Sequence, residues 1–348
     1  MTTHLPETDR LLGTSSTLVA APMAGGPTTV ALATAVAEAG AFPFLAGGYK
    51  SVEALAAEIE ELRRTGHPFG VNLFVPDRTA VVDAEAFAAY AAALKDDADR
   101  YGLVLSAEPV ADDDHYADKL ALLIEHPVPV VSLTFARPDP EDVQALQRVG
   151  TRVIATVTSP DEARLAATAG VDGLVVQGPG AGGHSATYDP ARTIEDGDTA
   201  DLVRAVREAT GLPIIATGGV DGPDAVRRLL DAGAEAVAVG TLLLRSDEAG
   251  TSATHRRALA DEAFTETVLT RAFTGRPARA LRSAFIDRHE HEAVGAYPAV
   301  HHLTRALRQA AGSAGDAHVL HLWAGTGWRS APTGPAADII AWLAPTES

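Results

Sequence analysis

The sequence predicts an α/β protein whose main part is a closed (β/α)8 barrel, joined by a second, smaller, mainly helical domain. Eight short apolar segments alternate with amphipathic segments of helical spacing between residues 17 and 241. Helical connections between strands are typical of right-handed crossovers, which make neighbouring strands parallel. Eight such units favour a closed barrel over an open, doubly wound sheet. The residues from about Ser246 onward do not continue the repeat.

Three strand–helix units open the chain. Apolar runs predict strands at residues 17–21, 42–46 and 69–75. The first helix is expected over residues 30–39, with Thr28 or Thr29 as its cap and Gly40 as its stop. The second is expected over residues 51–64, where Val52, Leu55, Ile59 and Leu62 share one face.

The repeat then pauses in an insertion from about residue 76 to residue 126. Helical spacing is found over residues 84–100 and again over 115–125. Between them lies the acidic run Asp112–Asp114, which lacks the register of a calcium loop and is expected to be a surface loop.

The remaining units complete the barrel. Strands are predicted at residues 128–135, 152–157, 173–176, 212–216 and 236–241, and helices at 140–149, 159–169, 199–209 and 223–232. We therefore assign residues 12–78 and 127–248 to the barrel. Residues 79–126 and 249–348 are expected to form a capping domain that folds over the barrel mouth and covers the substrate.

Composition limits the function classes. Hydrophobic residues make up 46% of the chain and charged residues 21%, and no apolar run is long enough to span a bilayer. The net charge of −18 opposes general binding to nucleic acid or anionic membranes. The first residues lack a secretion signal, which favours a cytoplasmic enzyme. The absence of cysteine excludes disulfides, iron–sulfur clusters, thiolate catalysis and cysteine zinc sites.

Glycine-rich loops follow the last three strands of the barrel, at the end where such barrels carry their active sites. Gly218–Gly219 and Gly240–Thr241 would present backbone N–H groups after strands seven and eight, as in a phosphate cradle. The alternative is that these glycines only make tight turns. The loop after strand six ends on His184 and is the candidate active site.

The order of these motifs resembles the nitronate monooxygenase family, also known as 2-nitropropane dioxygenase-like. The resemblance extends through most of the chain. It is carried by residues 22–26, 44–48, 70–74, 177–184, 216–219, 239–241, 271–279 and 322–327.

The resemblance implies an FMN-dependent oxidoreductase that uses O2 to denitrify alkyl nitronates and nitroalkanes, with no metal. The histidine equivalent to His184 would take the α-proton of a nitroalkane, and an imidazole of ordinary pKa can do so near pH 7. The partners would be these small molecules, with no nucleic acid or membrane, and an oligomer is left open. The residues implied to line FMN are Pro22, Met23, Ala24, Asn72, Gln177, Gly182, Gly183, Gly218, Gly219, Gly240 and Thr241.

One position departs from the family pattern. The chain has Gly180 where the family usually has glutamate, which leaves the orienting partner of His184 open. Ser185 and Thr187 also differ from the usual residues after the histidine, so substrate preference is expected to differ.

Several further residues are expected near the barrel mouth without an assigned role. Tyr49 and Lys50 follow strand two, and Tyr297 lies in the tail, as do the four histidines named next. His301, His302, His318 and His321 could approach the mouth in the folded-back tail, which spacing alone does not establish. The histidines of His289–Glu292 are two residues apart, which favours a solvated segment over a metal site.

Two alternative functions stay open. An FMN-dependent enoyl-thioester reductase would share the glycine loops and would require NAD(P)H. A non-catalytic FMN-binding barrel would keep the cradle without turnover. An IMP-dehydrogenase-like barrel is excluded, because its nucleophile is a cysteine and the chain has none.

Overall fold

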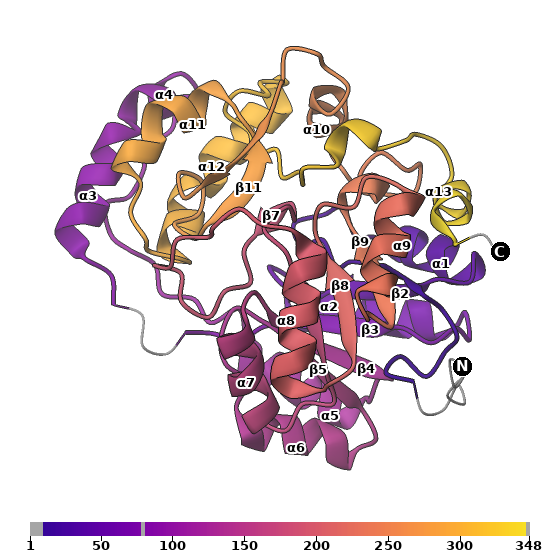
Figure 1. The fold of residues 1–348 in the computed structure, drawn as a ribbon. Coiled ribbons are helices and arrows are strands. Elements are labelled where there is room, and N and C mark those ends of the chain that lie inside the picture. The colour runs from indigo at the N-terminus through magenta and orange to yellow at the C-terminus, as the bar shows by residue number, and fades with distance from the viewer. Residues whose placement is uncertain (1–9, 78–80, 346–348) are drawn as a thin grey trace.

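The chain folds around a closed barrel of eight parallel strands, which confirms the predicted TIM-barrel class (Figure 1). The computed structural model describes residues 10–77 and 81–345. The barrel strands are β1 (Leu18–Ala20), β2 (Phe42–Ala46), β3 (Gly70–Phe74), β4 (Val130–Thr134), β5 (Arg152–Val157), β6 (Gly173–Gln177), β8 (Ile214–Thr217) and β9 (Ala236–Val239). The ring closes where β9 pairs with β1, with Val237 beside Leu18.

Helices cover the outside of the barrel and connect its strands. They are α1 (Val30–Glu38), α2 (Val52–Arg63), α5 (Tyr116–Glu125), α6 (Pro140–Arg148), α7 (Pro160–Thr168), α8 (Thr199–Thr210) and α9 (Pro223–Asp231), followed by the short η2 (Thr241–Leu243). Local sequence sets their ends: the Ser51 hydroxyl accepts from the N–H of Ala54 at the start of α2, and Gly211 ends α8 at φ 67°. The apolar stripe of α2 is buried as expected.

Two apolar layers hold the barrel together. The inner layer fills the barrel and includes Phe44, Ile154 and Ile215. The residues next to them along each strand point outward and form the outer layer, beneath the helices. A Cβ at Gly70 would lie 2.2 Å from the ring of Phe44, so this glycine leaves room for the aromatic side chain. Leu11 joins the inner layer from the segment before β1.

A smaller, mainly helical domain lies at one end of the barrel (Figure 1). Its helices are α3 (Ala84–Ala93), α4 (Lys95–Asp99), α10 (Ala253–Ala258), α11 (Ala284–His289), η3 (Glu290–Glu292) and α12 (Ala299–Ala314). It has its own apolar cluster, in which Phe87 and Tyr90 pack with Phe273 and Phe285. A hairpin of β10 (Thr267–Thr270) and β11 (Ala278–Leu281) adds β7 (Gly183–His184) to form a three-stranded antiparallel sheet.

The expected helix over residues 84–100 is wrong in one respect: it is broken at Leu94, where ψ is −1°. The break turns α4 toward α11, so that buried Asp97 lies 2.6 Å from His289 Nε2 and 2.8 Å from Arg288. These partners are distant in sequence, and local spacing gives no sign of them.

Two helices from the segments assigned to the cap pack on the barrel instead. Helix α5 contributes Tyr116 and Leu123 to the main apolar layer, next to α2 and α6. Helix α13 (Ala336–Leu343), which follows η4 (Trp328–Ser330), packs against α1 and α9. The exact boundaries of the two domains stay a prediction.

Among the described residues, no helix is both long and apolar enough to span a membrane.

Candidate active site

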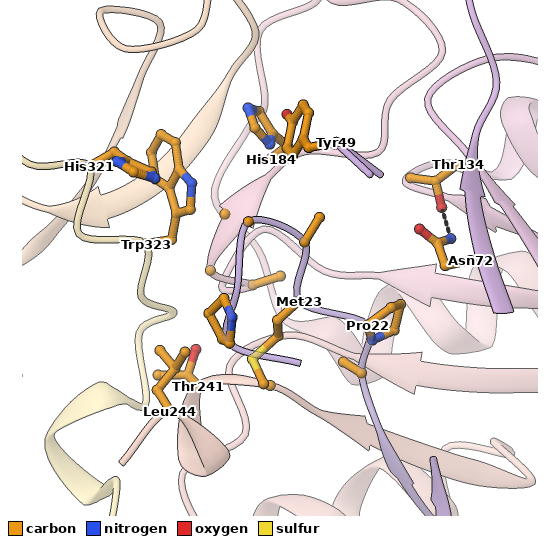
Figure 2. Close-up of a pocket in the computed structure, with 18 of the residues that line it drawn as sticks. Pro22, Met23, Tyr49, Asn72, Thr134, His184, Thr241, Leu244, His321 and Trp323 are labelled. Carbon is orange, nitrogen blue, oxygen red and sulfur yellow. Dashed lines mark hydrogen bonds between the residues drawn. The ribbon is translucent and has the colours of Figure 1, made fainter. Parts of the chain in front are cut away.

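A cavity of about 1070 Å³ lies at the carboxyl ends of the barrel strands, beneath the cap. Every residue singled out from the sequence as catalytic or cofactor-binding lines this cavity. Figure 2 shows Pro22, Met23, Asn72, Thr241 and His184 around it. Segments far apart in the chain therefore meet at one site, as the barrel fold requires.

The two glycine loops after β8 and β9 leave backbone donors free. Gly218 and Gly219 have φ values of 106° and 75°, which residues other than glycine rarely adopt. Within the described part of the chain, no residue accepts from the N–H groups of Gly219 and Gly240. Since buried N–H groups normally have partners, these two suit an anionic group of a ligand.

Asn72 presents an unused acceptor at the end of β3. Its side-chain nitrogen donates to Ser132 Oγ at 2.7 Å and to Thr134 Oγ1 at 2.8 Å, the second of which is drawn in Figure 2. The amide is thereby fixed in one orientation. None of the described residues donates to its oxygen, which remains available to a donor in the cavity.

The side chain of Gln177 holds the glycine-rich loop that follows β6 by bonding to its backbone. The side-chain nitrogen of Gln177 donates to the carbonyl of His184 at 3.1 Å, and its oxygen accepts from the N–H of Ala186 at 2.8 Å. Gln177 was expected to contact a cofactor, and half of its hydrogen-bonding capacity is used on this loop. One N–H and one lone pair remain for a ligand.

The glycine at position 180 is required by packing. A Cβ there would lie 2.8 Å from Thr326 Oγ1 and 3.0 Å from the Cα of Gly219. The carbonyl of Gly180 also accepts from the N–H of Thr326 at 2.9 Å. A glutamate side chain would require this contact between the loop and the tail to open.

His184 has Thr274 as its side-chain partner. The pairing of β7 with β11 places His184 opposite Ala278, so the turn at residues 271–277 lies beside the imidazole. Thr274 Oγ1 lies 2.9 Å from His184 Nε2 and 3.4 Å from the carbonyl oxygen of Arg276. Thr274 is 1% exposed, so water does not compete for this contact.

The surroundings of His184 are apolar and positively charged. Its ring lies against Phe135, Tyr297 and Trp323, with ring centres 5.3–5.7 Å away. Burial, followed by the charges of Arg276 and Arg308, lowers the pKa of His184 from 6.5 to about 3. The ordinary pKa assumed from the sequence is therefore wrong for this environment, and the ring is neutral at pH 7.

Arg276 fixes the backbone around His184. Its guanidinium donates to the carbonyls of Ser185, Phe135 and Thr187, and lies 4.2 Å from the centre of the Phe135 ring. The two residues that depart from the family pattern after the histidine thus use their backbone to anchor this arginine. Burial lowers the pKa of Arg276 to about 10, and it stays a cation.

A second polar cluster lies on the cap side of the cavity. Tyr49 Oη and Tyr297 Oη are 3.1 Å apart, and the ring of Tyr49 stacks on His301 with centres 4.2 Å apart. Tyr49, His301, His302 and His321 line the cavity. His318 does not, and instead lies beside Phe264.

Two expectations at the rim are corrected or refined. Asp112 and Asp113 are exposed, as expected of a surface loop, but Asp112 and Asp114 also line the cavity. Asp114 accepts from the N–H of Tyr49 at 2.8 Å and pairs with Lys119 at 2.9 Å. Lys50 also lines the cavity and pairs with Glu58.

Sequence reasoning did not single out Thr274, Arg276 or Arg308. The first two lie in the motif over residues 271–279, and only strand pairing brings that motif to His184. Arg308 shares a helical face with His301 and Thr304, which precede it by seven and four residues.

Comparisons with known proteins agree on one family. The family model described as nitronate monooxygenase matches residues 10–346. A relative from Staphylococcus aureus (strain Newman), named "Probable nitronate monooxygenase", is 31% identical over 335 residues, covering 95% of this chain and 94% of the relative.

Two solved structures are similar over nearly the whole chain. The crystal structure of nitroalkane oxidase from Streptomyces ansochromogenes is 44% identical, with a TM-score of 0.89 and coverage of 94% of each chain. The structure of FabK from Thermotoga maritima is 25% identical, with a TM-score of 0.75, and covers 98% of this chain and 95% of that one.

Proposed function

The chain belongs to the nitronate monooxygenase family and is an oxidoreductase, and we propose that it uses FMN and O2 to oxidise alkyl nitronates and nitroalkanes. In this proposal His184 takes the α-proton when the substrate arrives as a neutral nitroalkane. The observation that carries it is the single cavity that holds both His184 and the unused N–H groups of Gly219 and Gly240.

The residues of the cavity suit FMN. Gly218, Gly219, Gly240 and Thr241 would hold the phosphate, because free N–H groups next to the short η2 helix favour an anion. The ring system would lie against Met23 and its neighbours Pro22 and Ala24, with the free oxygen of Asn72 as an acceptor. When bound, FMN supplies the electron acceptor for the substrate and passes electrons on to O2.

Thr274 would set the proton-accepting nitrogen of His184. If the Thr274 hydroxyl donates to the carbonyl of Arg276, its oxygen accepts from Nε2–H of the imidazole. The proton of the neutral ring is then on Nε2, and Nδ1 keeps the lone pair that takes the α-proton. Thr274 thereby replaces the carboxylate that is missing at Gly180.

The depressed pKa of His184 has two consequences for this step. The imidazole is neutral at any pH near 7, which is the state that a base requires. A weakly basic nitrogen nonetheless accepts a proton less readily than an ordinary imidazole. The negative charge that develops on the substrate beside the ring offsets this, since an opposite charge stabilises the imidazolium.

The aromatic wall of Phe135, Tyr297 and Trp323 would exclude water from the reacting atoms. Exclusion of water would strengthen the electrostatic interactions of His184 with the substrate.

The test compares electron donors. Purified protein loaded with FMN is mixed without oxygen with ethyl nitronate, and separately with NADH or NADPH, while flavin absorbance is followed. Bleaching by the nitronate, together with O2 uptake in air, supports the proposal. Rapid bleaching by a pyridine nucleotide alone would favour an enoyl-thioester reductase, and bound FMN without any turnover would favour a non-catalytic barrel.

A further inference from the structure

Arg308 is a buried cation on the wall of the cavity. It lies on α12 and is 6% exposed. Its Nε donates to Thr304 Oγ1 at 3.0 Å, and Nη2 contacts the carbonyl oxygen and Nδ1 of His301 at 2.9 and 3.2 Å. All of these partners are neutral.

No carboxylate balances this charge. Among the described residues, none with a negative charge lies within ion-pair distance of Arg308, and none accepts from its Nη1. Burial lowers the pKa of Arg308 to about 10, so it is still a cation at pH 7. Buried charges are normally paired, and an unpaired guanidinium with an unused donor on a cavity wall suits an anionic ligand.

The neighbouring carboxylates pair with other residues and do not balance the charge of Arg308. Asp112 lies 2.8 Å from His302 Nε2, and Asp114 pairs with Lys119. Arg276, the other buried arginine near His184, donates to three carbonyls and does not line the cavity. Arg308 is therefore the buried guanidinium that a ligand in the described cavity would meet.

The charge of Arg308 acts on the part of the cavity that contains His184. Its charge contributes to lowering the pKa of His184, His301 and His321, and each of these histidines lines the cavity. Around it, Tyr49 and Tyr297 offer phenolic groups that carry no charge at neutral pH. Tyr49, His301 and Arg308 line the cavity here, and Tyr297 and Thr304 contact them from behind; we call these five residues the Arg308 recess. Arg305 also lines the cavity but is exposed, so Arg308 is the buried cation of this part of the wall.

We propose that Arg308, seated by His301 and Thr304, binds the anionic oxygens of the substrate and makes the cavity selective for nitronates over neutral nitroalkanes. A nitronate presents two oxygens on a planar nitrogen, which matches the planar donors of a guanidinium as a carboxylate does. This inference rests on the proposed function for its substrate. It also extends to small planar oxyanions, for which nitrate serves as the probe.

The experiment uses FMN-loaded wild type, Arg308→Gln and Arg308→Lys, with Arg257→Gln as the matched control. Arg257 is exposed on the neighbouring helix α10 and donates to a threonine hydroxyl, Thr254, without lining the cavity. Nitrate binding is measured from the change in flavin absorbance. Oxygen uptake gives kcat and KM for ethyl nitronate and for nitroethane.

We expect Arg308→Gln to weaken nitrate binding and raise KM for ethyl nitronate by about 10- to 100-fold, the range for a lost charge-assisted hydrogen bond. For nitroethane KM should change by less than about threefold, and Arg257→Gln should match the wild type in every measurement. Arg308→Lys should fall between wild type and Arg308→Gln, because lysine keeps the charge without the planar fork.

Unchanged nitrate binding and nitronate KM in Arg308→Gln would overturn the inference while the proposed function stands. If Arg308→Gln fails to fold, Arg308→Lys decides, and nitrate binding equal to the wild type would again overturn it. If the wild type consumes no O2 with any nitronate, the proposed function fails. Nitrate binding that still depends on Arg308 would then leave the recess established as an anion site.

Discussion

Replacing Thr274 with valine tests how the protein holds His184 ready to take a proton. Valine keeps the β-branched shape of threonine and removes only the hydroxyl that lies 2.9 Å from His184 Nε2. Because Thr274 is 1% exposed, no water replaces that partner. A buried group left without its hydrogen bond costs about 1–3 kcal/mol.

That cost sets the expected change in rate. Since about 1.4 kcal/mol corresponds to a tenfold change, kcat/KM for nitroethane should fall roughly 5- to 150-fold in Thr274→Val. Ethyl nitronate carries no α-proton that must be removed, so its kcat/KM should change by less than about threefold. Both are measured with an oxygen electrode at saturating FMN.

Thr274→Ser is the control, because serine restores the hydroxyl and should recover most of the nitroethane activity. The reasoning about Thr274 is refuted if the valine variant oxidises nitroethane at the wild-type rate. Equal losses on nitroethane and ethyl nitronate would also refute it, since they would indicate a general disturbance of the site.

Two further predictions concern stability and cofactor binding. Burial lowers the pKa of His255 to about 4, so its contribution to stability is complete above pH 6.5 and is lost as the pH falls toward 4. Between pH 7 and pH 5 the free energy of unfolding should fall by about 2 kcal/mol because of His255. The urea midpoints of His255→Asn should therefore depend less on pH than those of the wild type. Gly180→Ala should weaken FMN binding at least about tenfold, because its Cβ would meet Thr326 and Gly219; fluorescence titration showing wild-type affinity would contradict the packing argument.

Periodicity was sufficient to predict the barrel. The strands at β2 and β5 begin and end at the predicted residues, since each is a buried apolar run bounded by residues that break strands. Thr29, one of the two caps expected for α1, is its N-cap. These features depend on local sequence alone.

The contacts around His184 could not be predicted in this way. Its partner Thr274 is brought in by the pairing of β7 with β11, across 90 residues of chain. The low pKa of His184 depends on burial and on two arginines from separate elements. The break at Leu94 likewise depends on tertiary contacts, in which Asp97 of α4 pairs with His289 and Arg288. The position of Asp114 depends on its contacts with Tyr49 and Lys119.

The most direct test of the proposed chemistry is oxygen uptake by FMN-loaded His184→Asn with neutral nitroethane. A general base contributes about 10²- to 10⁴-fold, so the rate should fall by that factor while flavin absorbance shows that FMN is still bound. A rate within threefold of the wild type would contradict the assignment of His184 as the base.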